Sequence, residues 1–394
     1  MSDREVVFLS AVRTAIGDYG AGLKDIPAVD LGATVVRESV AQAGMDANDI
    51  GHCVLGNVIH TERRDMYLSR VAALQGGLNK ETPALTVNRL CGSGLQAIVS
   101  ATQLILLGDC DTAVAGGAES MSRGGYWLPG ARWGQRMGDG TVTDAMVGAL
   151  TDPFNGYHMG VTAENVAEKW GVSREDQDAL AVESHKRAAA ATAAGYFKSQ
   201  IVPVEVKTRR ETVMFETDEH IRGDASIEGM AKLRTVFKKD GTVTAGNASG
   251  INDAAAAVVL AERQTAEAKG LKPLARLVGY SFAGVEPEYM GIGPVPAVKK
   301  LLAKTGLGID DMSVFEVNEA FAAQALAVCR DLELPADRTN PNGSGISLGH
   351  PIGATGCVIT VKAIHELQRI GGRYGLITMC IGGGQGIAAI IERM

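Results

Sequence analysis

The chain has 394 residues, of which 46% are hydrophobic and 21% are charged, and its formal net charge is −7. This length predicts two or three domains, and the composition excludes an intrinsically disordered chain. The acidic balance argues against a nucleic-acid-binding protein, because such proteins normally carry a basic face.

Short apolar runs and helical patterns alternate through the first 120 residues, which is the order of an α/β domain. The elements expected in this part are Val6–Leu9, Leu31–Ala41, Val54–Ile59, Ala84–Val87 and Ala113–Ala115. From residue 121 to 248 the pattern loosens, with helices expected at Thr162–Trp170 and Arg174–Ala194. We interpret this middle part as an insertion.

The alternation resumes near residue 254 and continues to the end of the chain. The expected elements are Ala254–Leu260, Leu274–Tyr280, Val295–Leu302, Val314–Val317, helices from Glu319 and from Gly353, and strands at Tyr374–Cys380 and Ile387–Glu392. The two α/β units share one order of features, at 88–117 and at 340–384. A Gly-rich segment comes first, then a helix that ends at glycine, and then a strand that ends in glycines. The units are therefore interpreted as weak copies, which can build one active site at their shared boundary.

The cysteines and the chain ends indicate the compartment. Six cysteines are spread along the chain without a Cys-x-x-Cys pair, so neither a zinc ribbon nor a disulfide framework is expected. The first residues do not resemble a targeting leader, no apolar run is judged long enough to span a membrane, and Glu-Arg-Met at the end is no peroxisomal signal. We expect a cytoplasmic protein without a membrane span.

Cys91 is the first candidate for chemistry. It follows the strand expected at Ala84–Val87 and opens the next helix, with Gly92 and Gly94 beside it. A helix N-terminus stabilises a thiolate, and the glycines leave room for a substrate. The alternative is an inert cysteine that packs as a small hydrophobic residue.

Four other positions carry weaker signals of the same kind. His350 lies in a Gly/Pro turn ahead of a helix and could act as a base toward a thiol, or simply be satisfied by the turn. Cys380 ends a strand at the Gly382-Gly-Gly turn, whose N–H groups could face an oxyanion. Asn318 by itself suggests a helix N-cap, and Ser249 a turn residue.

Taken together, four motifs resemble the thiolase family in its own order. They are Asn88-Arg-Leu-Cys-Gly-Ser-Gly94, Asn318-Glu-Ala-Phe-Ala322, Gly349-His-Pro-Ile-Gly353 and Cys380-Ile-Gly-Gly-Gly-Gln-Gly386. The resemblance covers the chain essentially from end to end. It implies an α/β thiolase-like fold of two duplicated domains in αβαβα layers with an inserted loop domain. The expected domains are 1–120 with 249–273, 121–248, and 274–394.

The resemblance also implies a mechanism for these residues. Cys91 would accept an acyl group while His350 takes its proton, and Cys380 would remove a proton from the α-carbon of a second acyl-CoA. A water on Asn318, together with His350, would stabilise the enolate, and the N–H groups of Cys91 and Gly382 would hold the tetrahedral oxyanion. The expected reaction joins two acetyl-CoA molecules into acetoacetyl-CoA and coenzyme A.

A second set of residues resembles the family's tunnel for coenzyme A. The set contains Leu150, His158, Met159, Arg222, Phe237, Ala245, Ser249, Ala320 and Phe321. Arg222 would lie near the adenine end, and the segment around His158 resembles the short-chain branch of the family, with bacterial β-ketothiolases that supply polyhydroxyalkanoate synthesis as the best match. Potassium-binding members carry a tyrosine where His185 stands here, so we expect no metal and no cofactor beyond coenzyme A.

The family assembles as tetramers, so a homotetramer is expected here. Met121–Thr143 is the candidate contact, because Tyr126, Trp127, Trp133 and their neighbours are unusually apolar for a connecting segment. The alternative role for this segment is a lid over the chain's own site.

Three other functions remain as alternatives. A broader 3-ketoacyl-CoA thiolase of degradation shares every motif, and a ketoacyl-carrier-protein synthase or hydroxymethylglutaryl-CoA synthase shares the fold but lacks Cys380 in its glycine turn. A non-catalytic acyl-CoA or lipid-binding relative would not need the intact set of polar residues. The sequence has neither a dinucleotide-binding glycine pattern after its first strand nor a Gly-x-Ser-x-Gly elbow.

Overall fold

The computed structural model describes residues 4–208 and 211–394, so 1–3 and 209–210 of the predicted first and inserted domains lie outside it. Within the described residues, eleven strands pair into one mixed sheet. These strands are β1 (Val6–Thr14), β2 (Gly17–Asp18), β3 (His52–Gly56), β4 (Ala84–Val87), β5 (Thr112–Ser120), β8 (Ile201–Val202), β11 (Asn252–Glu262), β12 (Ala275–Gly284), β13 (Met312–Val317), β14 (Tyr374–Ile381) and β15 (Gln385–Arg393). The order along the sheet is β13-β14-β15-β12-β1-β11-β5-β3-β4.

The sheet consists of two halves with the same pairing pattern. In the N-terminal half, β1 pairs antiparallel with β11, β11 antiparallel with β5, and β5 parallel with β3. In the C-terminal half, β12, β15, β14 and β13 repeat this sequence of antiparallel, antiparallel and parallel pairs. The halves meet where Val7 and Phe8 of β1 pair with Arg276 and Ala275 of β12. The predicted duplication is therefore confirmed.

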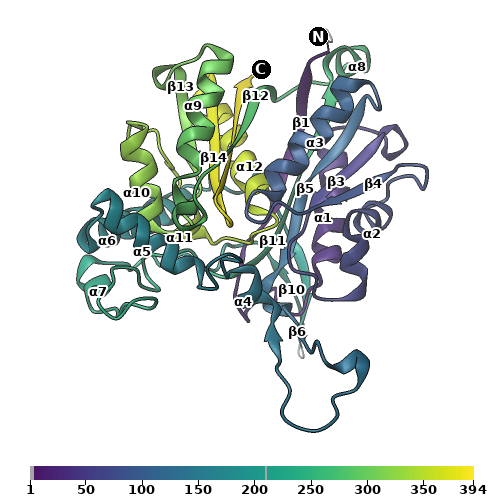
Figure 1. Ribbon diagram of the computed structural model, residues 1–394. Coiled ribbons are helices and arrows are strands. Elements are labelled where there is room, and N and C mark those ends of the chain that lie inside the picture. The colour runs from purple at the N-terminus through teal and green to yellow at the C-terminus, as the bar shows by residue number, and fades with distance from the viewer. Residues whose placement is uncertain (1–3, 209–210) are drawn as a thin grey trace.

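Helices fill the space between the halves and cover both outer faces (Figure 1). The helices are α1 (Ala28–Gln42), α2 (Leu68–Gln75), α3 (Ser93–Leu107), α4 (Ala145–Ala149), α5 (Met159–Trp170), α6 (Arg174–Ala193), α7 (Ile227–Ala231), α8 (Arg263–Ala268), α9 (Pro294–Thr305), α10 (Ala322–Asp331), α11 (Gly345–Leu348) and α12 (Thr355–Ile370). Helices α1 and α2 pack on the N-terminal half, α9 and α10 on the C-terminal half, and α3 and α12 lie between the two. This is the predicted αβαβα layering.

The two central helices approach each other through glycines. A Cβ atom on Gly94 would lie 2.7 Å from the backbone nitrogen of Cys357, and one on Gly356 would lie 2.3 Å from that of Leu95. Any larger side chain at either position would force α3 and α12 apart. Because the backbones touch here, the N-terminal ends of both helices, with Cys91 just before α3 and His350 just before α12, belong to the same region of the molecule.

Helix α3 corrects the expectation that no apolar run is long enough to span a membrane. The window Leu90–Leu107 has 18 residues and a mean hydropathy of 1.6, which is long and apolar enough by composition. However, 56% of this window is buried inside the molecule, where α3 packs against α12, β5 and β3. This burial is what the core helix of a globular domain shows.

The segment between β5 and β11 contains helices α4 to α7 and strand β8 of the main sheet. It also contains the short strands β6 (Tyr126–Trp127), β7 (Thr143–Asp144), β9 (Val204–Lys207) and β10 (Thr212–Phe215). The chain after β6 extends away from the body of the molecule at the bottom of Figure 1. In this extension Trp133 is 85% exposed and Met137 is 99% exposed.

Candidate active site

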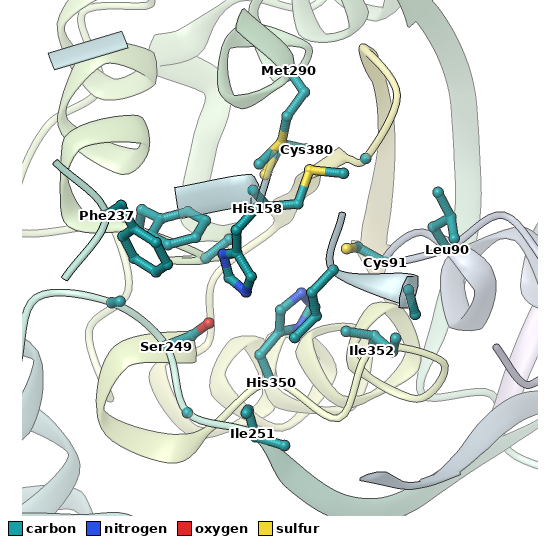
Figure 2. Close-up of a pocket in the computed structure, with 18 of the residues that line it drawn as sticks. Leu90, Cys91, His158, Phe237, Ser249, Ile251, Met290, His350, Ile352 and Cys380 are labelled. Carbon is teal, nitrogen blue, oxygen red and sulfur yellow. The ribbon is translucent and has the colours of Figure 1, made fainter. Parts of the chain in front are cut away.

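A cavity of about 410 Å³ lies where the two halves and the segment between β5 and β11 meet (Figure 2). Twelve of the fourteen predicted site residues line it, namely Cys91, Leu150, His158, Met159, Phe237, Ala245, Ser249, Ala320, Phe321, His350, Cys380 and Gly382. The wall also includes residues that were not predicted, namely Leu90, Met121, Ala149, Val236, Thr244, Ala248, Gly250, Ile251, Met290 and Ile352. Asn318 and Arg222 are not part of the wall.

Cys91 lies just before the N-cap of α3, on a strained turn. Leu90 has a φ of 47°, which is the left-handed region that residues other than glycine rarely adopt. The hydroxyl of the buried Ser93 holds this turn, because it accepts the N–H of Arg89 at 2.8 Å and donates to the carbonyl of Leu90 at 2.6 Å. The Cys91 sulfur thereby faces the cavity (Figure 2).

The surroundings of the Cys91 sulfur contain two backbone donors. The N–H groups of Gly382 and of Cys91 itself both hydrogen-bond to this thiol and favour its ionised form, yet burial outweighs them and raises the pKa of Cys91 to about 11. The backbone N–H groups at the helix N-terminus thus favour the thiolate, as expected, but they do not overcome the effect of burial. Cys91 is a thiol at neutral pH, and it needs a base to become a nucleophile.

His350 is held so that one ring nitrogen stays free. Its backbone N–H donates to Oδ1 of Asn252 at 2.9 Å, and its Nδ1 lies 2.7 Å from Oγ1 of Thr355. Its Nε2 has no hydrogen-bond partner among the described residues. Burial lowers the pKa of His350 to about 4, so the imidazole is neutral at pH 7 and can accept a proton.

Cys380 lies near the end of β14, on the far side of the cavity from His350 (Figure 2). Burial raises the pKa of this thiol, and the nearby Cys91 sulfur raises it further because two thiolates would repel each other. The turn that follows contains Gly383 and Gly384 at φ values of 80° and 83°. These left-handed residues reverse the chain so that Gly382 lines the cavity beside Cys380.

A buried carboxyl group that the sequence reasoning missed fixes the His350 turn. Oε1 of Glu119 accepts the side-chain amide of Asn57 at 2.9 Å and the N–H of Ile59 at 3.0 Å, and Oε2 accepts the N–H groups of Val58 at 3.0 Å and Gly353 at 2.8 Å. Burial raises the pKa of Glu119 to about 8, although these donors favour its ionised form and lower the pKa in part. Because all four contacts come from N–H groups, they match the ionised carboxylate.

Asn318 does not cap a helix, so the N-cap interpretation is wrong. Phe321, the residue before α10, is extended and bridges Ala248: the N–H of Ser249 donates to the carbonyl of Ala320 at 3.0 Å, and the N–H of Ala322 donates to that of Asn247 at 2.9 Å. Helix α10 therefore begins only at Ala322, not at Glu319. The Asn318 amide is fully buried, and neither of its polar atoms has a partner among the described residues.

Aromatic rings form the other end of the cavity. His158 stacks on Phe237 with ring centroids 4.7 Å apart, and Phe237 meets Phe321 edge-on at 6.3 Å. The Nδ1 atom of His158 accepts the N–H of Gly160 at 3.0 Å, and burial lowers the pKa of this histidine. An uncharged, flat wall of this kind suits the apolar part of a pantetheine arm.

Arg222 lies outside this cavity. Its side chain is 54% exposed and pairs with Asp18 at 2.8 Å, and its backbone N–H donates to Nδ1 of His185 at 3.1 Å. The buried His185 lies 6.4 Å from His220 between ring centroids. Among the described residues no group of three or more His, Cys, Asp or Glu side chains could hold a metal ion. That no metal is required stays a prediction.

Comparison with known proteins identifies the family. The family described as Thiolase, N-terminal domain, matches residues 6–264, and that described as Thiolase, C-terminal domain, matches 271–393. The chain is 66% identical to Beta-ketothiolase BktB of Cupriavidus necator and 52% identical to the acetyl-CoA acetyltransferase of Chromobacterium violaceum, in both cases over 99% of this chain and the whole relative.

Solved structures agree with this result. The acetyl-CoA acetyltransferase of Bacillus anthracis superposes with a TM-score of 0.97 at 46% identity, over 100% of both chains. Human mitochondrial 3-ketoacyl-CoA thiolase in complex with CoA superposes with a TM-score of 0.96 at 45% identity, over 99% of this chain and 98% of the other. The chain belongs to the thiolase family and has the thiolase fold.

Proposed function

We propose that this chain is an acyltransferase that catalyses the reversible condensation of acetyl-CoA with a short acyl-CoA, two acetyl-CoA giving acetoacetyl-CoA and coenzyme A. The observation that carries this proposal is the arrangement around one cavity of two thiols, Cys91 and Cys380, and a neutral imidazole whose Nε2 is free, that of His350. The full-length identity to a β-ketothiolase supports it. A pure binding protein would not need two thiols and a base in one cavity.

In the first half-reaction Cys91 becomes acylated. Nε2 of His350 takes the thiol proton as the sulfur attacks the thioester carbonyl carbon of acetyl-CoA. The oxyanion of the tetrahedral intermediate accepts the N–H groups of Cys91 and Gly382, which already meet at the Cys91 sulfur. The bond to the coenzyme A sulfur then breaks, and that sulfur receives the proton from His350, which leaves acetyl-Cys91 and free coenzyme A.

In the second half-reaction Cys380 acts as the base. Its thiolate, formed after loss of a proton to solvent, takes a proton from the α-carbon of a second acetyl-CoA. The burial that raises the pKa of Cys380 makes this thiolate a strong base. The enolate carbon attacks the Cys91 thioester, Cys91 departs as a thiolate, and it recovers the proton that Cys380 held. Acetoacetyl-CoA is the product, and the reverse sequence is thiolysis.

The enolate oxygen needs donors during the second half-reaction. We assign this role to the Asn318 amide acting through a water and to His350, whose Nε2 must first take up one proton from solvent, in place of the proton that Cys380 released there. The unpaired amide of Asn318 supports the assignment, because a buried amide without a partner costs about 1–3 kcal/mol unless it has a use or a water. Since Asn318 is not part of the cavity wall, it needs such a bridge to reach the substrate.

The aromatic end of the cavity is the proposed coenzyme A site, and coenzyme A is the substrate rather than a resident cofactor. The stacked pair His158 and Phe237, with Phe321, would contact the pantetheine arm. Arg222 would meet the nucleotide at the surface, where its half-exposed guanidinium is available to an anionic or adenine group. We expect neither a metal nor any other cofactor to take part.

We further propose a cytoplasmic homotetramer. The six cysteines are all free, which suits a reducing compartment. Strand β6 exposes Tyr126 and Trp127, and the extension after it exposes Trp133 and Met137. Burial against a partner chain would remove this apolar surface from water. The second role for this extension is a lid. Supply of polyhydroxyalkanoate precursors is the proposed pathway, with degradation as the alternative.

Two variants test the division of work between the thiols. Cys91→Ala is expected to form no acetyl-enzyme with acetyl-CoA, measured as the mass of the Cys91 peptide. Cys380→Ser is expected to form acetyl-Cys91 but to lose condensation and thiolysis, since a serine hydroxyl gives up its proton far less readily than a thiol and so cannot supply the base. Normal thiolysis by the Cys91→Ala protein would contradict the assignment.

A further inference from the structure

The imidazole of His350 has one polar neighbour on its Nδ1 side, the hydroxyl of Thr355. Both residues are buried, at 5% and 2% exposure. Oγ1 of Thr355 lies 2.7 Å from Nδ1 of His350 and 2.9 Å from the carbonyl oxygen of Pro351. Thr355 is the first residue of α12, so this contact ties the ring to the beginning of the helix.

The protons in this chain of three polar atoms can be placed by counting. Each of the two short contacts needs one proton, the carbonyl of Pro351 has none, and the hydroxyl has only one. If the hydroxyl donated to Nδ1, two oxygen atoms would face each other at 2.9 Å without a proton between them. The arrangement that satisfies both contacts has Nδ1–H donating to Oγ1 and Oγ1–H donating to Pro351.

This placement decides which nitrogen can act as a base. The neutral ring carries one proton, and with that proton on Nδ1 the lone pair is on Nε2. Nε2 is also the ring nitrogen without a hydrogen-bond partner among the described residues. We propose that Thr355 is a positioning residue that fixes the tautomer and orientation of His350, so that Nε2 keeps its lone pair for the Cys91 thiol. The proposal rests on the proposed role of His350 as the base.

A hydroxyl in this place differs from the carboxylate that orients histidine in many hydrolases, because it carries no charge to stabilise an imidazolium. His350 then holds a proton only briefly. This property fits a base that must return the proton to the departing coenzyme A sulfur within the same half-reaction.

The positioning role of the Thr355 hydroxyl can be tested apart from a structural role, because other hydrogen bonds hold the His350 turn. The backbone N–H of Thr355 donates to Pro351 at 2.9 Å whatever the side chain is. The His350 turn is also pinned by Asn252 through the His350 N–H and by Glu119 through the Gly353 N–H. Valine has the shape of threonine without its hydroxyl, so Thr355→Val leaves these ties in place. It removes the acceptor for Nδ1–H and the hydroxyl's own bond to Pro351.

The experiment is single-turnover acetylation of Cys91 by acetyl-CoA, with the dependence on acetyl-CoA concentration measured for each variant. Thr355→Val is expected to lower the saturating rate about 10- to 100-fold, the range implied by leaving Nδ1–H without an acceptor, while half-saturation changes less than about 3-fold. Thr355→Ser is expected to recover most of this loss. Thr355→Ala is expected to show the loss too, if the valine protein does not fold.

Thr360→Val is the matched control. The Thr360 hydroxyl is also buried on α12 and donates to the carbonyl of Gly356 at 2.7 Å, in a bond that does not involve His350. Acetylation by Thr355→Val at the wild-type rate, or an equal loss in Thr360→Val, or no recovery in Thr355→Ser, would overturn the proposal. His350→Ala tests whether His350 is the base at all. Acetylation by that variant at the wild-type rate would overturn the role of His350, and not only the role of Thr355.

Discussion

Gly160→Ala tests the proposed coenzyme A end of the cavity. A Cβ atom on Gly160 would lie 2.1 to 2.3 Å from three ring atoms of Phe237, whereas carbon atoms in contact normally stay about 3.5–4.0 Å apart. The Phe237 ring must therefore retreat by more than about 1 Å. That movement breaks its stack on His158 and its edge contact with Phe321.

The size of the effect follows from the packing that the pantetheine arm loses when the Phe237 ring moves. If that packing contributes as much as one aromatic contact, about 0.5–1.5 kcal/mol, the KM for coenzyme A should rise roughly 2- to 12-fold at 1.36 kcal/mol per tenfold. The reacting groups Cys91 and His350 do not touch Gly160, so kcat should stay within about 2-fold, as for a loss of uniform binding. Alanine in helix α5 gains about 1 kcal/mol of helix propensity, which offsets only part of the overpacking, so the melting temperature should fall modestly.

The assay is steady-state thiolysis of acetoacetyl-CoA with varied coenzyme A. Gly308→Ala is the control, because a Cβ atom there makes only an ordinary 3.7 Å contact with Asp311 at an exposed turn. An unchanged KM in Gly160→Ala would refute the assignment of the Phe237 wall to coenzyme A. A fall in kcat with unchanged KM would refute it as well.

Further predictions concern Glu119, Cys91 and the extension after β6. Glu119→Gln leaves two of four buried N–H donors without an oxygen, and should lower the free energy of unfolding by about 2–6 kcal/mol, measured by urea denaturation. Because burial raises the pKa of Cys91 to about 11, its labelling by iodoacetamide should rise roughly tenfold per pH unit from pH 7 to 9. Trp133→Ser, which removes an 85% exposed ring, should convert the proposed tetramer to smaller species, measured by light scattering.

A Glu119→Gln protein as stable as the wild type would mean that the carboxylate does not hold the His350 turn. Labelling of Cys91 that is already maximal at pH 7 would show a preformed thiolate and remove the need for a base. Wild-type tetramers in Trp133→Ser would favour the lid as the role of the extension.

The sequence predicted the fold and most of the cavity because the signals are local. The strand at Ala84–Val87 was placed correctly, and the expected repeat of the first α/β unit appears as the same strand pairing in both halves. Cys91, His350 and Cys380 stand in glycine turns at the ends of such elements, so the duplication alone could bring them to one boundary.

Residues whose role depends on long-range packing were misread or missed. Asn318 looks like a helix cap in sequence, but Phe321 pairs with Ala248 as a β-bridge, so the helix begins only at Ala322. Met290 reaches the cavity from a short turn that adjoins no motif. Glu119 lies within a strand, and its function arises only when the His350 turn packs above it. Leu90 and Ile352 stand inside recognised motifs, so those motifs could have revealed them.

The central claim is that this cavity makes and breaks the carbon–carbon bond of a short 3-ketoacyl-CoA through acyl-Cys91. The most direct measurement is thiolysis of acetoacetyl-CoA by purified protein and free coenzyme A, followed by loss of the enolate absorbance and by the mass of the Cys91 peptide. The account predicts turnover together with an acetyl group on Cys91, and neither in Cys91→Ala. Absence of turnover by the wild-type protein, or equal turnover by Cys91→Ala, would contradict it.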